Sequence, residues 1–92
     1  MENTTIETNT YSTLSDNRDI PLEWKIGNIV RKIRKERKFT QTKLSHKSKL
    51  ADNTIHTVEN GGRSASIRTL QIIANTLNCD LIVEFRKRDS DE

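Results

Sequence analysis

Residues 40–61 decide the fold of this chain, and they read TQTKLSHKSKLADNTIHTVENG. Thr40 has the hydroxyl that a helix N-cap needs, so it predicts a helix at 41–48. Apolar residues at helical spacing predict a second helix at 52–60, which Gly61-Gly62 ends. Only a short turn separates the two helices, and together they are expected to bury Leu44, Ser45, Ser48, Ile55 and Val58.

A further helix is predicted on each side of this pair. Pro21 suits the first turn of a helix, because that position leaves its amide unbonded in any case. The helix predicted at 21–37 places a row of apolar residues on one face: Leu22, Ile26, Ile29, Val30 and Ile33. Ser64 and Ser66 are candidate caps for the helix predicted at 67–77, which is expected to bury Ile67, Leu70, Ile73, Ala74 and Leu77.

The apolar pattern changes period after these helices. Residues 80–86 read DLIVEFR, which is rich in β-branched and aromatic residues and predicts a strand at 81–86. A single strand is unstable alone, so we expect it to pair with its copy in a second subunit, across a two-fold axis. The alternative is an extended tail that packs on the chain's own helices. The expected dimer contact comprises Leu81, Ile82, Val83 and Phe85.

Charge divides the chain into parts. A polar arm at 1–20 carries a net −3 and is expected to be disordered, and a disordered tail is expected at 87–92. The helical segment at 21–80 holds twelve basic residues against five acidic ones, a net +7. This excess favours a polyanionic partner, although a solvated helix face is the alternative interpretation. Only 32% of the 92 residues are hydrophobic, a shortage of core that also favours a dimer.

Several classes of protein are not expected. No apolar run is long enough to span a membrane, and the N-terminus does not resemble a signal peptide. The single cysteine, Cys79, suits a reducing cytoplasm. His46 and His56 lie on different predicted helices, with no cluster of cysteines or carboxylates at ligand spacing. We therefore expect a cytoplasmic protein with no metal, no cofactor and no catalytic site.

Two short helices joined by a tight turn, after a basic first helix, follow the helix-turn-helix plan. Residues 26–41, IGNIVRKIRKERKFTQ, resemble the first helix of the Xre/phage-repressor family and its approach to the second. Residues 54–61, TIHTVENG, resemble that family's recognition helix and exit, and the resemblance extends over 26–81. It implies an all-α, lambda-repressor-like DNA-binding domain at 21–80, with four to five helices and the strand at 81–86 paired across a dimer.

The helix at 52–60 is expected to enter the major groove, with Asn53 well suited to read adenine. Gln41 lies at a helix N-terminus, where its side chain and free amides suit a phosphate. The resemblance also implies a buried ion pair between Arg34 and Glu59. The expected DNA contacts are Thr40, Gln41, Asp52, Asn53, Thr54, His56, Thr57, Asn60 and Arg63.

The chain departs from the family at several positions. Lys38 and Lys49 stand where glycine is common, and a positive φ strains a residue with a side chain. Ser45 replaces a usual alanine, so its hydroxyl needs an acceptor. Ala51 replaces a usual serine or threonine cap, and Asp52 places an acid on the expected DNA face.

The short chain and its C-terminal strand resemble the antitoxins of type II toxin–antitoxin modules, HipB-like or HigA-like. This resemblance implies a homodimer that binds an inverted-repeat operator, represses its own operon and binds a toxin. The toxin would be a HipA-like kinase or a HigB-like ribonuclease. The alternative is a stand-alone Xre regulator or a restriction-system controller protein without a toxin. A protein-interaction adaptor that does not bind DNA is a further alternative, which the basic helical segment disfavours.

Overall fold

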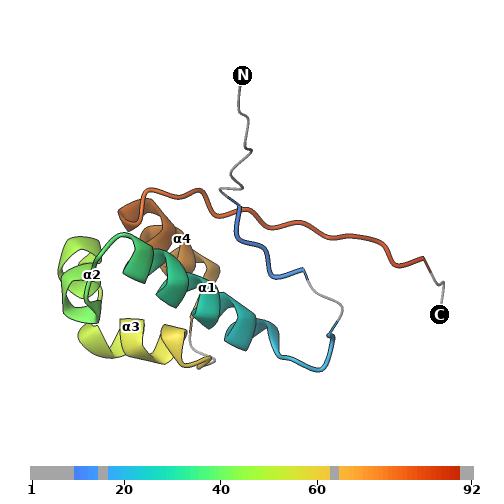
Figure 1. The fold of residues 1–92 in the computed structure, drawn as a ribbon, viewed down its shortest axis with the longest axis horizontal. Coiled ribbons are helices and arrows are strands. Elements are labelled where there is room, and N and C mark those ends of the chain that lie inside the picture. The colour runs from blue at the N-terminus through green and yellow to red at the C-terminus, as the bar shows by residue number, and fades with distance from the viewer. Residues whose placement is uncertain (1–9, 15–16, 63–64, 90–92) are drawn as a thin grey trace, which may run out of the picture.

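The computed structural model describes residues 10–14, 17–62 and 65–89. Within this part of the chain there are four helices and no strand: α1 (Leu22–Glu36), α2 (Gln41–Ser48), α3 (Asp52–Glu59) and α4 (Ile67–Thr76). The helix α3 packs against both α1 and α2, and α2 also contacts α4 (Figure 1). This arrangement confirms an all-α helix-turn-helix domain, and each helix lies within a residue or two of its predicted bounds.

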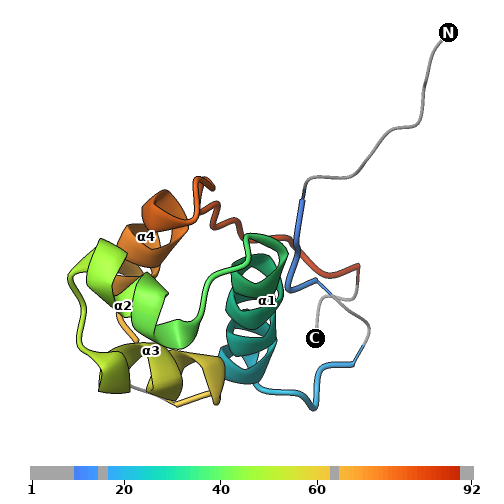
Figure 2. The same cartoon turned by 60° about the vertical axis from the view of Figure 1, so that its left-hand side comes forward.

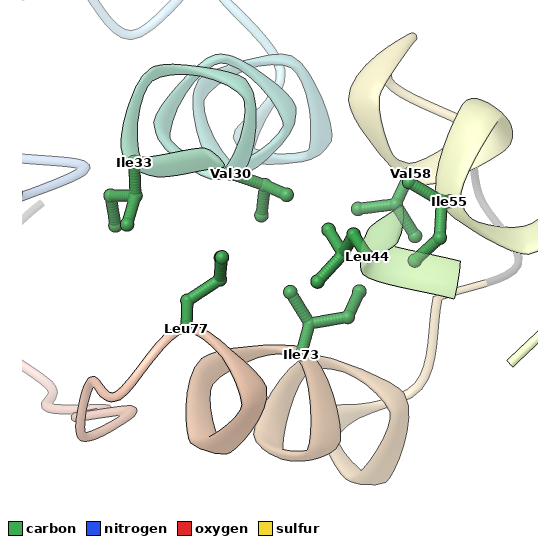
Figure 3. Packing of buried hydrophobic residues seen from close by; sticks show 7 residues of the cluster. All are labelled: Val30, Ile33, Leu44, Ile55, Val58, Ile73 and Leu77. Atoms are coloured by element: carbon green, nitrogen blue, oxygen red, sulfur yellow. The ribbon is translucent and has the colours of Figure 1, made fainter. Parts of the chain in front are cut away.

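One apolar core joins the helices. Side chains from all of them converge on a common centre (Figure 3). Its buried members are Val30, Ile33, Leu44, Ile55, Val58, Ile73 and Leu77. The expected burial of Ile67 is wrong, since this residue is 66% exposed, and Leu22 in the apolar row of α1 is 55% exposed. Each of the two is the first residue of its helix, so its side chain extends past the end of the packed face.

Each helix is followed by a residue in the left-handed conformation. These residues are Lys38, Lys49, Gly61 and Asn78, with φ between 62° and 79°. The next amide N–H then donates to a carbonyl five residues back, at 2.8–3.2 Å, in the pairs Phe39–Arg34, Leu50–Ser45, Gly62–Thr57 and Cys79–Ala74. This is the Schellman arrangement, and it bonds carbonyls that a helix end leaves unpaired. Lys38 and Lys49 thus adopt the backbone that glycine adopts most easily.

The other positions at which the chain departs from the family pattern are accommodated by nearby contacts. Ser45 is buried, and its hydroxyl donates to the carbonyl of Leu50 at 2.6 Å, which ties α2 to the turn that follows. Thr40 caps α2 as expected, because its Oγ1 accepts from the amide of Lys43 at 3.0 Å. Ala51 precedes α3 without a side-chain cap.

Part of the N-terminal arm is packed against the domain. Residues 10–14 were expected to be disordered, but Tyr11 is half-buried against the core cluster. Its hydroxyl donates to the Glu36 carboxylate, and the ammonium group of Lys32 lies 5.5 Å from its ring centroid. A tyrosine can pack its ring against apolar residues and bond through its hydroxyl at the same time. These contacts explain why this part of the arm is ordered and not disordered as expected. Residues 1–9 lie outside the described residues.

The segment at 81–86 is extended but is not a strand within this chain. It runs away from the helices (Figure 1). Phe85 within it is 99% exposed. The expected strand at 81–86 is therefore not formed here, because no other strand lies beside it in the described chain. The alternative, a tail packed on the chain's own helices, is not observed either. Residues 87–89 are exposed, and the rest of the predicted tail lies outside the described residues.

Candidate nucleic-acid interface

The helices α2 and α3 form one side of the molecule, away from residues 10–14 and the extended segment at 80–89 (Figure 2). The inner face of α3 is fixed to the core by Ile55 and Val58, both buried. Its outer face carries the polar residues that the sequence assigned to DNA. Asp52, Asn53, His56 and the adjacent Asn60 are exposed, whereas Thr54 and Thr57 are half-buried.

A buried carboxylate holds this face in place. The side chain of Glu59 is fully buried, and Arg34 donates to it through Nε at 2.6 Å and Nη2 at 3.0 Å. The structure therefore contains the ion pair between these two residues. Arg34 also donates through Nη1 to the carbonyl of Phe39, at 2.8 Å. One guanidinium thus connects α1, α3 and the residue that precedes the cap of α2.

The protonation of Glu59 follows from its partners. Burial by itself raises the pKa of a carboxyl group, because it disfavours the charged form. Here the hydrogen bonds from Arg34, Gln41 and Arg31 outweigh burial, and the pKa of Glu59 lies below its ordinary value of 4.5. The carboxylate is therefore charged at neutral pH and does not face the solvent.

The side chain of Gln41 does not point where the sequence analysis expected. Its side-chain Nε2 donates to Oε1 of Glu59, at 3.0 Å. The amide was expected to point toward a phosphate, yet it binds the buried carboxylate and joins the start of α2 to the end of α3. The backbone amide of Gln41 still lies in the first turn of α2, beside Thr40.

The sequence-based prediction missed Arg31. Its Nη2 donates to the carbonyl of Glu59 at 3.1 Å and to Oδ1 of Asn60 at 3.2 Å, and its Nε lies 3.4 Å from the Glu59 carboxylate. Asn60 in turn has its Nδ2 2.9 Å from Nε2 of His56. Arg31 precedes Arg34 by three residues, so the two share one helix face, and this spacing was the available indication.

The glycine turn after α3 is tightly packed. A β-carbon on Gly62 would overlap the methyl group of Thr57, which therefore packs under the turn and not outward. The indole of Trp24 covers Gly61, where an added β-carbon would lie 3.0 Å from its Cδ1. Arg63, the remaining expected DNA contact, lies outside the described residues.

Other kinds of site are not indicated in the part of the chain that the structure describes. It contains no group of three or more histidine, cysteine, aspartate or glutamate residues that is placed to hold a metal ion. None of its helices combines the length and the apolar character that crossing a membrane requires.

The comparisons with known proteins agree with this geometry. The sequence pattern of the helix-turn-helix family HTH_3 matches residues 30–83, more than half of the chain, so the protein belongs to this family. It is a helix-turn-helix DNA-binding regulator. A similar solved structure is that of the wild-type restriction-modification controller protein C.Esp1396I, with 31% identity and a TM-score of 0.60. The likeness covers 63% of this chain and 75% of that one. No match is found among curated proteins.

Proposed function

We propose that this protein is a homodimeric transcriptional regulator that reads an inverted-repeat operator with α3, as a stand-alone regulator or a restriction-system controller protein. The observation that carries the proposal is the two-sided character of α3. Ile55 and Val58 fix one side to the core, while Asn53 and His56 are exposed on the other. A rigid helix with polar, hydrogen-bonding residues on its outer face is what major-groove recognition requires.

The similarity to a controller protein supports this function over that of an antitoxin. The antitoxin interpretation requires a HipA-like kinase or a HigB-like ribonuclease as partner, and neither the family match nor the similar structure supports a toxin partner. The regulator function accounts for the polar face of α3 without any such partner.

Different residues have different roles in the proposed complex. Asn53 is exposed in the first turn of α3, where a side-chain amide can form two hydrogen bonds with adenine. Thr40, Gln41, Asn60 and Arg63 are proposed to contact phosphates, with Gln41 acting through its backbone amide since its side chain binds Glu59. Asp52, Thr54 and His56 complete the proposed surface, together with the hydroxyl of Thr57, whose methyl group packs under the glycine turn.

The dimer is proposed to form through residues 81–86. Ile82, Val83 and Phe85 are 75%, 63% and 99% exposed, which leaves an apolar extended segment without cover from the described chain. Pairing with a second copy would bury these side chains and bond the free main-chain groups. A dimer would also place two copies of α3 about one helical turn apart on DNA, which requires an inverted repeat.

The experiment is selection of binding sites from random duplexes, followed by affinity measurements on the selected site. The expected site is an inverted repeat with half-site centres about 10 base pairs apart. Asn53→Ala is expected to cost about 1–3 kcal/mol and to relax the preference at one base pair. Asn28→Ala, an exposed change on α1 beside residues 10–12, is the control and should bind as the wild type does. Unchanged affinity and specificity of Asn53→Ala would show that α3 is not the reading helix.

A further inference from the structure

A chain of hydrogen bonds runs from α1 to the exposed face of α3. Arg31 Nη2 lies 3.2 Å from Asn60 Oδ1, and Asn60 Nδ2 lies 2.9 Å from His56 Nε2. Arg31 is itself fixed, because the same Nη2 donates to the carbonyl of Glu59 and its Nε approaches the buried carboxylate. We call these bonds from Arg31 through Asn60 to His56 the relay. It begins at the buried carboxylate of Glu59 and ends at a solvent-exposed imidazole.

The direction of each bond in this relay is set by chemistry. A guanidinium group only donates, so the atom of Asn60 that faces Arg31 must be the carbonyl oxygen. The amide nitrogen of Asn60 then faces His56, and it too only donates. The Nε2 atom of His56 must consequently accept, which requires a lone pair there. A neutral imidazole that accepts at Nε2 carries its proton on Nδ1.

We propose that Arg31 and Asn60 hold His56 as the Nδ1–H tautomer and so make it a hydrogen-bond donor toward DNA. His56 is exposed on α3, and its Nδ1 has no partner among the residues that the structure describes. The ligand chemistry is a hydrogen-bond acceptor on the operator, such as guanine O6 or N7 or thymine O4. This proposal rests on the proposed function, because it assigns specificity to a residue of the reading helix.

Fixing the tautomer of His56 restricts which base edges this residue can contact. A histidine free to change tautomer can present either a donor or an acceptor at Nδ1, and so tolerates either kind of base edge. Locked as a donor, His56 rejects an amino group such as cytosine N4 or adenine N6, because two donors then face each other. Arg31 is thus a positioning residue for specificity, although it acts only through Asn60.

The first test is made without DNA, on the full chain, by 15N–1H correlation NMR of the imidazole rings above their titration range. His56 is expected to show the Nδ1–H pattern. His46, exposed on α2, is the internal reference for a solvated ring. Arg31→Met keeps most of the side-chain length but removes the donor, so His56 should lose the single-tautomer pattern. Lys35→Met, an exposed change on the same helix, controls for the lost charge.

A second variant inverts the relay. Asn60→Asp replaces the amide donor with a carboxylate that only accepts, so His56 should be protonated at Nε2. Circular dichroism of each variant verifies that the helices are intact. An Nε2–H pattern in the wild type, or an unchanged Nδ1–H pattern in folded Arg31→Met, would overturn the relay.

The DNA test separates this proposal from the function on which it rests. On the selected operator, Arg31→Met is expected to lose preference at one base pair by roughly fivefold, the worth of one hydrogen bond. An equal loss on every sequence would assign the acceptor to a phosphate and overturn the base-reading role. Unchanged binding of all sequences would overturn the proposal, because it would show that the hydrogen bonds from Arg31 through Asn60 to His56 do not contribute to recognition. If the wild type binds no duplex at all, the proposed function fails, while the NMR result still decides the relay.

Discussion

The backbone of Gly27 in α1 lies so close to that of Val58 in α3 that an added β-carbon would be 2.5 Å from the Val58 carbonyl oxygen. This close approach lets the buried part of α1 pack directly on the end of α3. The obstacle is main chain and not a flexible side chain, so neither helix can give way locally.

Gly27→Ala is accordingly expected to lower the free energy of unfolding by about 1–3 kcal/mol, the usual cost of overpacking. Alanine favours helix over glycine, so a destabilising result would isolate the effect of the close contact. Urea denaturation followed by circular dichroism measures it, with the exposed neighbour change Asn28→Ala as control. A Gly27→Ala protein as stable as the wild type would contradict the α1–α3 packing.

The lowered pKa of Glu59 makes stability depend on pH. The folded state holds the Glu59 proton less tightly than the unfolded state, whose carboxyl titrates near 4.5. The ion pair therefore stabilises the domain fully above that value, and the contribution is lost as pH falls through the lower, folded-state pKa.

Glu59→Gln removes this dependence together with the ion pair. At neutral pH it is expected to destabilise the domain by about 3 kcal/mol, because the Arg34 guanidinium stays buried without its counter-charge. Between neutral pH and about pH 3, the wild type should lose more stability than the variant does. Asp80→Asn, which changes an exposed carboxyl, is the matched control. Equal acid sensitivity of wild type and Glu59→Gln would exclude this carboxyl as the source.

The left-handed residue after α1 offers a route to higher stability. Lys38 has φ 63°, a conformation that costs a residue with a side chain about 1 kcal/mol relative to glycine. Lys38→Gly is expected to raise the melting temperature, whereas Lys38→Ala should leave it near that of the wild type. Since both variants remove the same charge, their difference reports the backbone alone. A glycine variant no more stable than the alanine variant would argue against this conformation.

Tyr11 gives a direct spectroscopic measure of how the arm packs. Its hydrogen bond to Glu36 raises the pKa of the phenol above its ordinary value of 10.0. The chain contains one tyrosine, so ultraviolet absorbance of tyrosinate follows this group alone. Glu36→Gln should lower the midpoint of the titration toward the ordinary value. If both proteins titrate together, the arm is not held by this contact.

The proposed dimer is tested at residue 83. Val83→Asp introduces a charge into the segment that would be paired, so it is expected to give a monomer in sedimentation analysis. Arg86→Ala, an exposed change outside the apolar set, should leave the dimer intact. A Val83→Asp protein that remains dimeric would place the interface elsewhere on the domain.

The helices were predictable because the features that start and stop them are local. Pro21, Thr40 and the glycines at 61 and 62 each act on backbone within a few residues, so the sequence alone predicts where α1 and α2 begin and where α3 ends. The same reasoning predicted burial for Leu44 and Ile55, both fully enclosed. The exposed outer face of α3 followed from these inward positions.

Contacts between residues far apart in the sequence were less accessible to such reasoning. Tyr11 contacts a residue 25 positions away, Arg31 one 28 away, and the Gln41 side chain one 18 away. These pairings depend on how the helices cross, which no local pattern specifies. The extended segment at 81–86 shows the opposite case. Its composition predicts a strand, but a strand also needs a neighbour, and the described chain does not supply one.

The eight residues of α3 have a consequence for how operator recognition can fail. Isolated helices shorter than about 12–15 residues are marginal in water, so α3 persists only while its inner side remains packed. A substitution deep in the core, far from any base, can therefore abolish the proposed operator binding without touching a proposed contact residue. Variation on the outer face of α3 is free to change the preferred sequence, whereas the inner face cannot vary without erasing the ability to recognise any sequence.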